Sequence, residues 1–229
     1  MKRYCFIIPV KEDLRVINRV ANLLSKANNY GLDNFEVIIV QDDDISYEID
    51  RSLLPKNCSL EVKKNPGKIG KGSAVRYGLS QSTADIHCIL DSDESLAIED
   101  IFEACLKYRE GHLLSGVRLY ENSTEKIRRI LGMVQNILAN LFSLEFYVQD
   151  TQCPLKIIDN SILDIILRNL TIDGGMYDVQ LLKIIQKNGI PLILYPVIRI
   201  DGDISVLRLR NIIFGDFIDL IRIRFSKYD

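Results

Sequence analysis

The chain has 229 residues, of which 47% are hydrophobic and 26% charged, and its formal net charge at pH 7 is −2. These values fit one globular α/β domain with a sizeable core, and the charge argues against general affinity for nucleic acid. The five cysteines are odd in number and have no CxxC spacing, so they indicate neither a disulfide framework nor a zinc site.

Apolar runs of strand length alternate with stretches of helical periodicity. The expected strands cover 4–10, 35–40, 84–90 and 190–197, and the expected helices lie near 13–28, 70–81, 97–108, 124–142 and 176–188. This alternation predicts an α/β fold in which a mostly parallel central sheet is covered by helices on both faces. No linker or repeat interrupts the pattern, so we expect a single domain over residues 1–229.

The last expected helix, at about 207–227, is amphipathic. Its apolar stripe consists of Phe214, Phe217, Ile218, Ile221 and Phe225. Packing against the domain is the commoner fate of such a stripe, and contact with an anionic membrane through the basic residues beside it is the alternative. Since no signal peptide and no membrane-spanning apolar run is visible, we expect a cytoplasmic protein, with peripheral attachment to the cytoplasmic face of a membrane as the other outcome.

Acidic side chains follow two of the expected strands. Asp91, Asp93 and Glu94 come after the third strand, and Gln41–Asp44 end the second. Because ligands of parallel sheets bind beyond the carboxyl ends of the strands, these residues are expected to meet in one crevice. Turns and helix N-caps use the same residue types, but crowded carboxylates repel each other, and a divalent cation with a diphosphate offsets that repulsion. Such oxygen ligands favour Mg²⁺ or Mn²⁺.

Basic and polar segments add candidate phosphate and sugar contacts. The segment NPGKIGKGSAVR, residues 65–76, is a glycine-rich turn that carries Lys71 and Arg76 into a helix, and free N–H groups and lysines in such turns attract phosphate. It lacks the Ser or Thr that follows the lysine of a Walker motif, and a solvated loop is the plain alternative. The segment DTQCPLK, 150–156, and Asp178 place polar groups in apolar surroundings, where a ligand can pair with them.

Seven segments in chain order resemble the inverting family 2 glycosyltransferases with a GT-A fold, and within them the dolichyl- and polyprenyl-phosphate hexose synthases. They read IIPVKED (7–13), VIIVQDDD (37–44), GKGSAVRYGL (70–79), LDSDESLAIEDI (90–101), SGVR (115–118), DTQCPLKI (150–157) and MYDVQLL (176–182). The segment 90–101 is similar to the DxD region of that family, and the last two segments are similar to the DTQCGFK and FDVELL boxes of the dolichyl-phosphate glucosyltransferase branch.

The resemblance implies a role for each matching residue. The nucleotide-sugar donor would meet Pro9, Asp13, Asp42, Lys71, Arg76, Asp91 and Asp93. Asp91 and Asp93 would hold the Mg²⁺ or Mn²⁺ ion. The acceptor would meet Arg118, Arg129, Gln152 and Lys156. The residues implied in catalysis are Asp93, Arg118, Arg129, Asp150 and Asp178.

The implied reaction moves a hexose from a UDP-glucose or GDP-mannose type donor to a polyprenyl or dolichyl phosphate, with inversion at C1. A lipid phosphate is already an anion, so it needs positioning by Arg118 and Arg129 more than deprotonation. A saccharide hydroxyl is the alternative acceptor, and it needs a carboxylate base such as Asp150 or Asp178. A non-catalytic nucleotide-sugar-binding protein and a sugar-1-phosphate nucleotidyltransferase are further alternatives, but the second expects glycines after the first strand that are absent here.

The sequence departs from the family pattern at several positions. Lys11–Asp13 replace the aromatic-Asn-Glu of the opening turn. Gln41 replaces the first acid of VVDDGS, and Asp43 and Asp44 stand where Gly and Ser are usual. Pro154 and Leu155 stand for Gly-Phe, and Gln180 stands for the Glu of FDVELL. The last change removes a carboxylate from the expected acceptor side, so the choice of acceptor or sugar is left open.

Overall fold

A computed structural model describes residues 2–67, 69–120, 126–200 and 209–228, and within them the side chains of 53, 120, 126–129, 131 and 209–214 lie outside the description. The strands are β1 (Tyr4–Val10), β2 (Phe35–Gln41), β3 (Ser59–Lys64), β4 (Ile86–Ile89), β5 (Leu113–Tyr120), β6 (Lys156–Asp159) and β7 (Leu192–Arg199). The α-helices are α1 (Arg15–Lys26), α2 (Lys71–Gln81), α3 (Ile98–Lys107), α4 (Lys126–Phe142), α5 (Asn160–Asn169), α6 (Tyr177–Lys187) and α7 (Leu209–Phe225), and two 3₁₀ turns cover Ala27–Tyr30 and Arg51–Leu53.

The strands form one seven-stranded sheet in the order β3-β2-β1-β4-β6-β5-β7. The β3, β2, β1 and β4 strands are parallel to one another, β5 is parallel to β7, and β6 is antiparallel to both of its neighbours. The expected α/β fold with a mostly parallel sheet is therefore confirmed for the described residues. Its one reversed strand separates the first half of the chain from the second.

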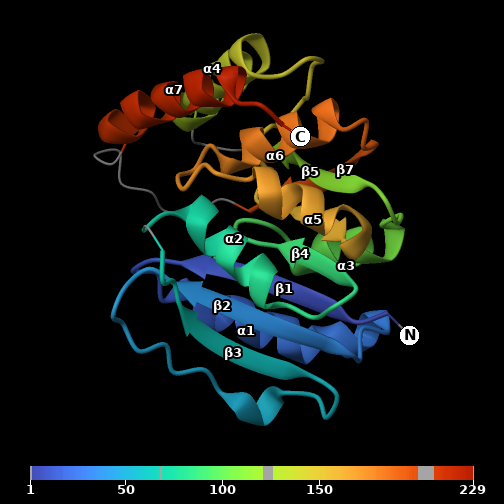
Figure 1. Cartoon of the computed structure of the whole chain (residues 1–229). Helices are drawn as coiled ribbons and strands as arrows, with labels where there is room; N and C mark the ends of the chain where they lie inside the picture. The colour runs from blue at the N-terminus through green and yellow to red at the C-terminus, as the bar shows by residue number, and fades with distance from the viewer. Residues whose placement is uncertain (1, 68, 121–125, 201–208, 229) are drawn as a thin grey trace.

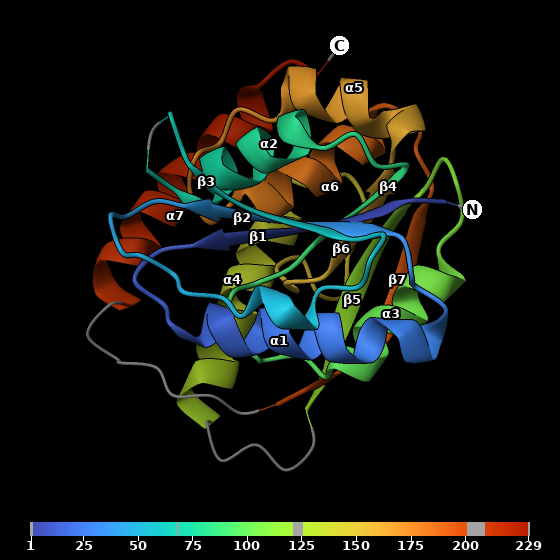
Figure 2. The ribbon, with the colours of Figure 1, turned by 90° about the horizontal axis from the view of Figure 1, so that it is seen from below.

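Alternation along the strands explains the two helical layers. In β1, Phe6 and Ile8 pack with α1 and α3, whereas Cys5 and Ile7 pack with α2 and α6. Figures 1 and 2 show these layers, with α2, α5 and α6 over one face of the sheet and α1 and α3 over the other. Strands buried on both faces read as continuous apolar runs, which is the pattern of β1 and β2.

The α4 and α7 helices lie side by side beyond the sheet and share a smaller apolar cluster with α6 (Figure 1). Ala139 of α4, Met176 and Val179 near α6, and Leu220 and Ile223 of α7 are its buried members. In the described part of the chain no helix combines the length and apolar character needed to cross a bilayer.

Several elements differ from the sequence expectation. The β3, β5 and β6 strands and α5 were not expected, because β3 is a half-exposed edge strand and β6 has only four residues. The apolar stripe expected on the last helix does not pack onto the domain as predicted. Leu220 and Ile223 are buried instead, while Phe217, Ile218, Ile221 and Phe225 are exposed, and Phe214 lies outside the described side chains.

Candidate functional site

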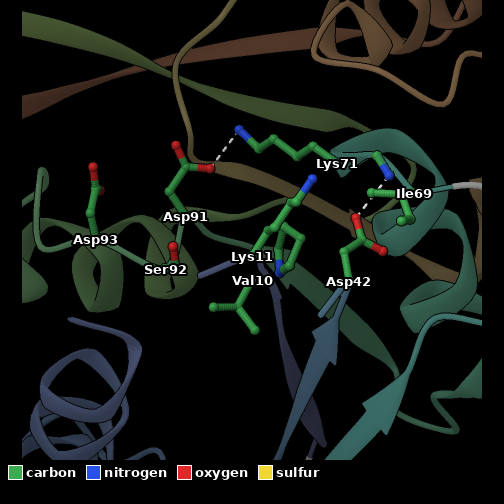
Figure 3. Close-up of a pocket in the computed structure, with 10 residues that line it drawn as sticks. Val10, Lys11, Asp42, Ile69, Lys71, Asp91, Ser92 and Asp93 are labelled. Atoms are coloured by element: carbon green, nitrogen blue, oxygen red, sulfur yellow. Dashed lines mark hydrogen bonds and ion pairs between the residues drawn. The ribbon is translucent and has the colours of Figure 1, made fainter. Parts of the chain in front are cut away.

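The carboxyl ends of β1, β2 and β4 meet at one edge of the sheet, as their register requires. Val10 is paired with Gln41, Asp42 N donates to Val10 O (2.9 Å), and Leu90 N donates to Ile7 O (3.0 Å). A cavity of about 390 Å³ lies there, shown in Figure 3. It is lined by Pro9, Val10, Lys11, Asp42, Ile69, Gly70, Lys71, Asp91, Ser92 and Asp93. We call this cavity the donor pocket, after the donor contacts that the resemblance implies for residues in its wall.

Asp42 ties the glycine-rich turn to the end of β2. Its Oδ1 accepts from Asn65 Nδ2 (2.7 Å) and its Oδ2 accepts from the backbone N of Gly70 (2.8 Å), a contact that Figure 3 marks. The carboxylate is therefore held in one orientation at the pocket wall. In this position it can accept hydrogen bonds from the N–H edge of a nucleobase.

Lys71 forms an ion pair with Asp91 at the centre of the pocket wall, with 2.5 Å between Nζ and Oδ1 (Figure 3). Its ammonium also lies 5.5 Å from the centre of the Tyr177 ring. Burial opposes the charge on Lys71, but Asp91 and Asp178 raise its pKa overall. Burial raises the pKa of Asp91, and the nearby Asp93 adds to this, against the lowering effect of Lys71. The pair therefore fixes the ammonium of Lys71 between Gly70 and residues 91–96, which we call the acidic loop.

The acidic loop is held by α1 through contacts that sequence reasoning missed. Arg19 is buried, and its Nε (2.9 Å) and Nη2 (2.5 Å) donate to Asp93 O while Nη1 donates to Leu96 O (3.2 Å). Asp13 accepts from Ser92 Oγ (2.8 Å) and pairs with Arg15 (2.8 Å). An arginine inside the helical pattern 13–28 was the available signal, because a charged residue on the apolar side of a helix needs partners.

Asp91 and Asp93 fit a divalent cation that arrives with its substrate. In the part of the chain that the structure describes, no three His, Cys, Asp or Glu residues gather into a complete metal site. Two carboxylates at a pocket wall nevertheless match the way Mg²⁺ is commonly bound, with one or two carboxylates and the remaining ligands from phosphates and water. The two aspartates are the residues that would hold the ion.

A second cavity of about 500 Å³ lies on the other side of Lys71. We call it the acceptor chamber, after the acceptor contact that the resemblance implies for Gln152 in its wall. Its wall includes Lys71, Gln135, Gln152, Asp178, Asp216 and Asp219, together with Met176 and Gly174, Gly175 and Gly215. Burial raises the pKa of Asp216 to about 6, and the neighbouring Asp219 adds to this. Three of the lining residues, Asp178, Asp216 and Asp219, carry carboxyl groups, whereas Lys71 is the one basic residue among the described residues that line the chamber.

Arg118 and Asp150 form a two-pronged ion pair beside a third cavity of about 230 Å³. Arg118 Nε and Nη2 each lie 2.7 Å from a carboxylate oxygen of Asp150. Burial opposes ionisation of Asp150, but the Arg118 guanidinium lowers its pKa overall. The pair is thus charged and fixed in orientation, and neither partner faces the donor pocket.

The structure places Arg76 and Lys156 away from the contacts expected of them. Arg76 is turned away from the donor pocket, since it donates to Leu170 O (3.0 Å) and pairs with Asp173 (2.7 Å). Lys156 is fully buried under the acceptor side, where its Nζ donates to Cys153 O (2.6 Å) and lies 3.1 Å from Asp178. The side chain of Arg129 lies outside the described residues.

The glycine-rich turn has a packing role that the phosphate interpretation overlooked. The N–H groups of Gly72 (2.8 Å) and Ser73 (3.2 Å) donate to Asp173 O, so this part of the helix start is already occupied. A Cβ at Gly72 would stand 2.2 Å from Ile172 O. The glycines therefore let the loop before α6 approach the helix, and a phosphate would be left to Lys71 and the rest of the turn.

Two departures from the family pattern have structural roles. Asp43 accepts from Glu12 N (2.6 Å) and Tyr47 OH (2.7 Å), and it holds Glu12 at a φ of 51°. Gln180 is fully buried; its Oε1 accepts from the N–H groups of Thr171 and Ile172 (both 2.8 Å), and its Nε2 donates to Thr171 Oγ1 (2.9 Å). An ionised glutamate cannot donate that last bond. Gln180 therefore holds the loop at Thr171 and Ile172 in place.

Comparison with known proteins finds relatives of similar sequence. The chain is 23% identical over 210 residues to a dolichyl-phosphate beta-glucosyltransferase of Trichomonas vaginalis and 26% identical over 213 residues to one of Dictyostelium discoideum. These alignments cover 84% of the chain but only 62% and 63% of the relatives, so the chain spans less than two thirds of their length.

Solved structures share the fold at low identity. A mannosyltransferase of Pyrobaculum calidifontis, in complex with GDP-mannose and Mn²⁺, is 18% identical with a TM-score of 0.63 over 100% of this chain and 66% of its own. A glucosyl-3-phosphoglycerate synthase of Mycobacterium tuberculosis, in complex with Mn²⁺ and UDP, is 16% identical with a TM-score of 0.62 over 98% of this chain and 82% of its own. The fold is thus the expected GT-A fold. Since the profile of the family described as "Glycosyl transferase family 2" matches residues 5–164, which is more than half of the chain, the chain belongs to glycosyl transferase family 2.

Proposed function

We propose that this protein is a metal-dependent, inverting hexosyltransferase that uses a nucleoside-diphosphate sugar. The donor pocket carries the proposal, because it gathers three kinds of contact at the ends of three parallel strands. Asp42 offers a carboxylate to a nucleobase, Lys71 offers a cation to a diphosphate, and Asp91 and Asp93 offer oxygen ligands to a cation. UDP or GDP-mannose with Mn²⁺ in the solved structures of similar fold supports the same choice of ligand.

In the proposed reaction an acceptor oxygen attacks C1 of the sugar from the face opposite the nucleotide. The bond from C1 to the diphosphate oxygen breaks, its electron pair leaves with the nucleoside diphosphate, and the configuration at C1 inverts. Lys71 lies between the donor pocket and the acceptor chamber, so its charge is placed to stabilise the departing diphosphate. A divalent cation supplies further neutralisation of that leaving group when it is bound.

The acceptor that we propose first is a polyprenyl or dolichyl phosphate. The names of the curated relatives support it, as does the similarity of 150–157 to the DTQC box. An anionic acceptor needs orientation more than a base. Arg118 can orient the acceptor phosphate, because Asp150 fixes the plane of the Arg118 guanidinium beside the third cavity.

A saccharide hydroxyl is a second candidate acceptor, and the acceptor chamber favours it. Asp178, Asp216 and Asp219 line that chamber and would repel a phosphate, whereas carboxylates accept hydrogen bonds from hydroxyl groups. A hydroxyl nucleophile also requires a base, and Asp178 or Asp216 can provide one. The raised pKa of Asp216, about 6, suits a group that takes up a proton near neutral pH.

A transfer assay separates these acceptors. The purified protein is incubated with Mn²⁺ and radiolabelled UDP-glucose or GDP-mannose, with a polyprenyl phosphate in one arm and a panel of saccharides in the other. Label in the organic phase supports the lipid phosphate, and label in the saccharide fraction supports the hydroxyl. Absence of both transfer and donor hydrolysis across the panel would contradict the proposed activity.

The Asp178→Asn variant sharpens the result. With a phosphate acceptor, its rate per folded molecule should stay within about tenfold of the unsubstituted protein, because no proton is removed. Thermal melting measures the folded fraction, since Asp178 is also the buried partner of Lys156. With a hydroxyl acceptor that uses Asp178 as base, its rate should fall by roughly 10²–10⁴ while donor binding is kept.

A further inference from the structure

The α4 helix is apolar on two sides, although only one side packs against the protein. Ala139 is buried in the cluster that α4 shares with α6 and α7. Met133, Ile137 and Leu141 follow helical spacing along the other side and are 56%, 50% and 69% exposed. Solvated helices normally carry polar residues on the outer side, so this second apolar stripe needs an explanation.

The α7 helix repeats this arrangement beside it. Leu220 and Ile223 are buried, while Phe217, Ile221 and Phe225 recur every four residues and are 40%, 41% and 77% exposed. The two stripes join where the rings of Phe142 and Phe217 meet edge to face, with 6.0 Å between their centres. We call the six exposed residues Met133, Ile137, Leu141, Phe217, Ile221 and Phe225 the α4/α7 face.

Charges on α7 are sorted between the two sides of the helix. Asp216 and Asp219 line the acceptor chamber, whereas Arg224 and Lys227 are exposed around the end of the α4/α7 face. Arg222 is also exposed but pairs with Asp219 (3.2 Å). Arg224 also donates to Phe142 O (3.1 Å), which keeps its guanidinium at the end of α4. An apolar face with cations at its edge is complementary to an anionic lipid surface.

The α4/α7 face is continuous with the candidate site. Gln135 of α4 and Asp216 of α7 line the acceptor chamber and are hydrogen-bonded to each other (2.8 Å). Each stands beside residues of the face on its own helix, and Met133 of the face also lines the third cavity, so the face adjoins both the acceptor chamber and the third cavity. Whatever covers the face therefore lies beside the chamber.

We propose that the α4/α7 face rests on an anionic lipid surface, with its apolar side chains at the level of the headgroups. An isologous dimer through the same face is less compatible with the charges, because it would bring the cations of two copies towards each other. If the acceptor is a lipid phosphate, the contact brings it to the chamber, and this part of the proposal rests on the proposed function. The contact itself rests only on the exposed residues and their charges.

Vesicle sedimentation tests the contact without donor or acceptor. The protein is mixed with phosphatidylcholine vesicles or with vesicles that also contain phosphatidylglycerol. We expect binding to the anionic vesicles that weakens with added salt. Each basic residue near such a surface contributes roughly a fivefold factor, so Arg224→Glu with Lys227→Glu should weaken partitioning by at least about tenfold.

A matched pair of variants separates the face from general surface hydrophobicity. Leu141→Ser with Phe225→Ser should lose most vesicle binding, whereas Leu106→Ser, which removes a 55% exposed leucine on α3, should bind like the unsubstituted protein. Circular dichroism and thermal melting confirm that the variants fold. Failure to bind anionic vesicles, or equal binding by the two apolar variants, would overturn the proposal. So would light scattering that shows a dimer which Leu141→Ser with Phe225→Ser converts to a monomer.

Activity towards a short, water-soluble isoprenyl phosphate distinguishes this proposal from the proposed function. Without vesicles, Leu141→Ser with Phe225→Ser should turn over that acceptor like the unsubstituted protein, since neither residue lines a cavity of the site. If no phosphate acceptor is used but anionic vesicles are still bound through the face, the acceptor assignment fails and the membrane contact stands. If the phosphate is used but anionic vesicles are not bound, the membrane contact fails and the acceptor assignment stands.

Discussion

The two halves of the sheet present their polar residues in different ways. On the donor side, between β3 and β4, the polar residues stand at the ends of parallel strands and open into one pocket. On the acceptor side, between β6 and β7, Arg118, Asp150, Lys156 and Asp178 are committed to one another in buried or half-buried pairs. A regular parallel sheet therefore gathers its polar residues at one pocket by topology alone, even though Lys71 and Asp91 are paired there, whereas the charges of the mixed half are placed by contacts that depend on long-range packing.

The largest expected effect is on the donor side, at the acidic loop. Asp93→Asn should lower turnover by on the order of 10³, because it removes a ligand of the cation that neutralises the leaving diphosphate. Glu94→Gln is the matched control, since Glu94 belongs to the same loop but accepts a hydrogen bond from Asn22 (2.5 Å) and does not line the donor pocket. Steady-state rates at saturating Mn²⁺ measure both. Similar losses in the two variants would mean that loop charge, rather than this ligand, matters.

On the acceptor side the largest effect should be on stability. Lys156→Met removes one partner of the fully buried pair with Asp178 and should lower the free energy of unfolding by about 3–5 kcal/mol, because the remaining carboxylate is left without its cation. The double variant Lys156→Met with Asp178→Leu should recover much of that loss. Urea denaturation measures the three proteins. A small effect of Lys156→Met alone would show that the pair is not needed for the fold.

An intermediate effect is expected where α1 supports the acidic loop. Arg19→Met leaves the carbonyls of Asp93 and Leu96 without their buried donor and should destabilise the fold by about 2–3 kcal/mol. It should also weaken Mn²⁺ binding in the presence of UDP, which electron paramagnetic resonance can follow without turnover. Arg15→Met, which removes a half-exposed partner of Asp13, is the control and should change Mn²⁺ binding little. Unaltered Mn²⁺ binding in Arg19→Met would limit Arg19 to a purely structural role.

The smallest expected effect is a pH dependence on the acceptor side. Burial raises the pKa of Asp216 in the folded state to about 6 from an ordinary value of 3.8. A raised pKa means that the folded state binds the proton more tightly, so the stabilisation is complete below about pH 4 and is lost as the pH rises through about 6. Asp216→Asn should remove this loss, and because the partly exposed carboxylate is screened by solvent, the gain should be about 1 kcal/mol relative to the unsubstituted protein between pH 4 and 7. Parallel pH dependences of the two proteins in thermal melts would contradict it.

The same contrast explains what could be predicted from the sequence. The strands that carry Pro9, Asp42 and Asp91 are long apolar runs, and their strand ends meet because parallel strands share a direction. The roles of Arg76 and Lys156 could not be seen, because their partners Asp173 and Asp178 are distant in the chain and become neighbours only through α2, β6 and α6. Short or half-exposed strands such as β6 and β3 carry too little periodicity to be recognised.

The outer helices show a second limit. Residues Phe217, Ile221 and Phe225 form a clear stripe, but periodicity does not say whether a stripe faces the protein or its surroundings. In the structure Leu220 and Ile223 take the inner side, so the expected stripe became the exposed one. Both sides of α7 are apolar, and only the contacts with α4 and α6 decide between them.

Binding of a nucleoside-diphosphate sugar and a divalent cation in the donor pocket can be measured by thermal shift. UDP-glucose and GDP-mannose are each added with Mn²⁺ or with EDTA, to the unsubstituted protein and to Asp93→Asn. At about a hundred times the dissociation constant, a ligand adds about 2.7 kcal/mol, which raises the Tm of a domain of this size by roughly 5–10 °C. We expect such a shift for at least one donor, dependent on Mn²⁺ and lost in Asp93→Asn. No shift with either donor, or the same shift with EDTA and in the variant, would contradict it.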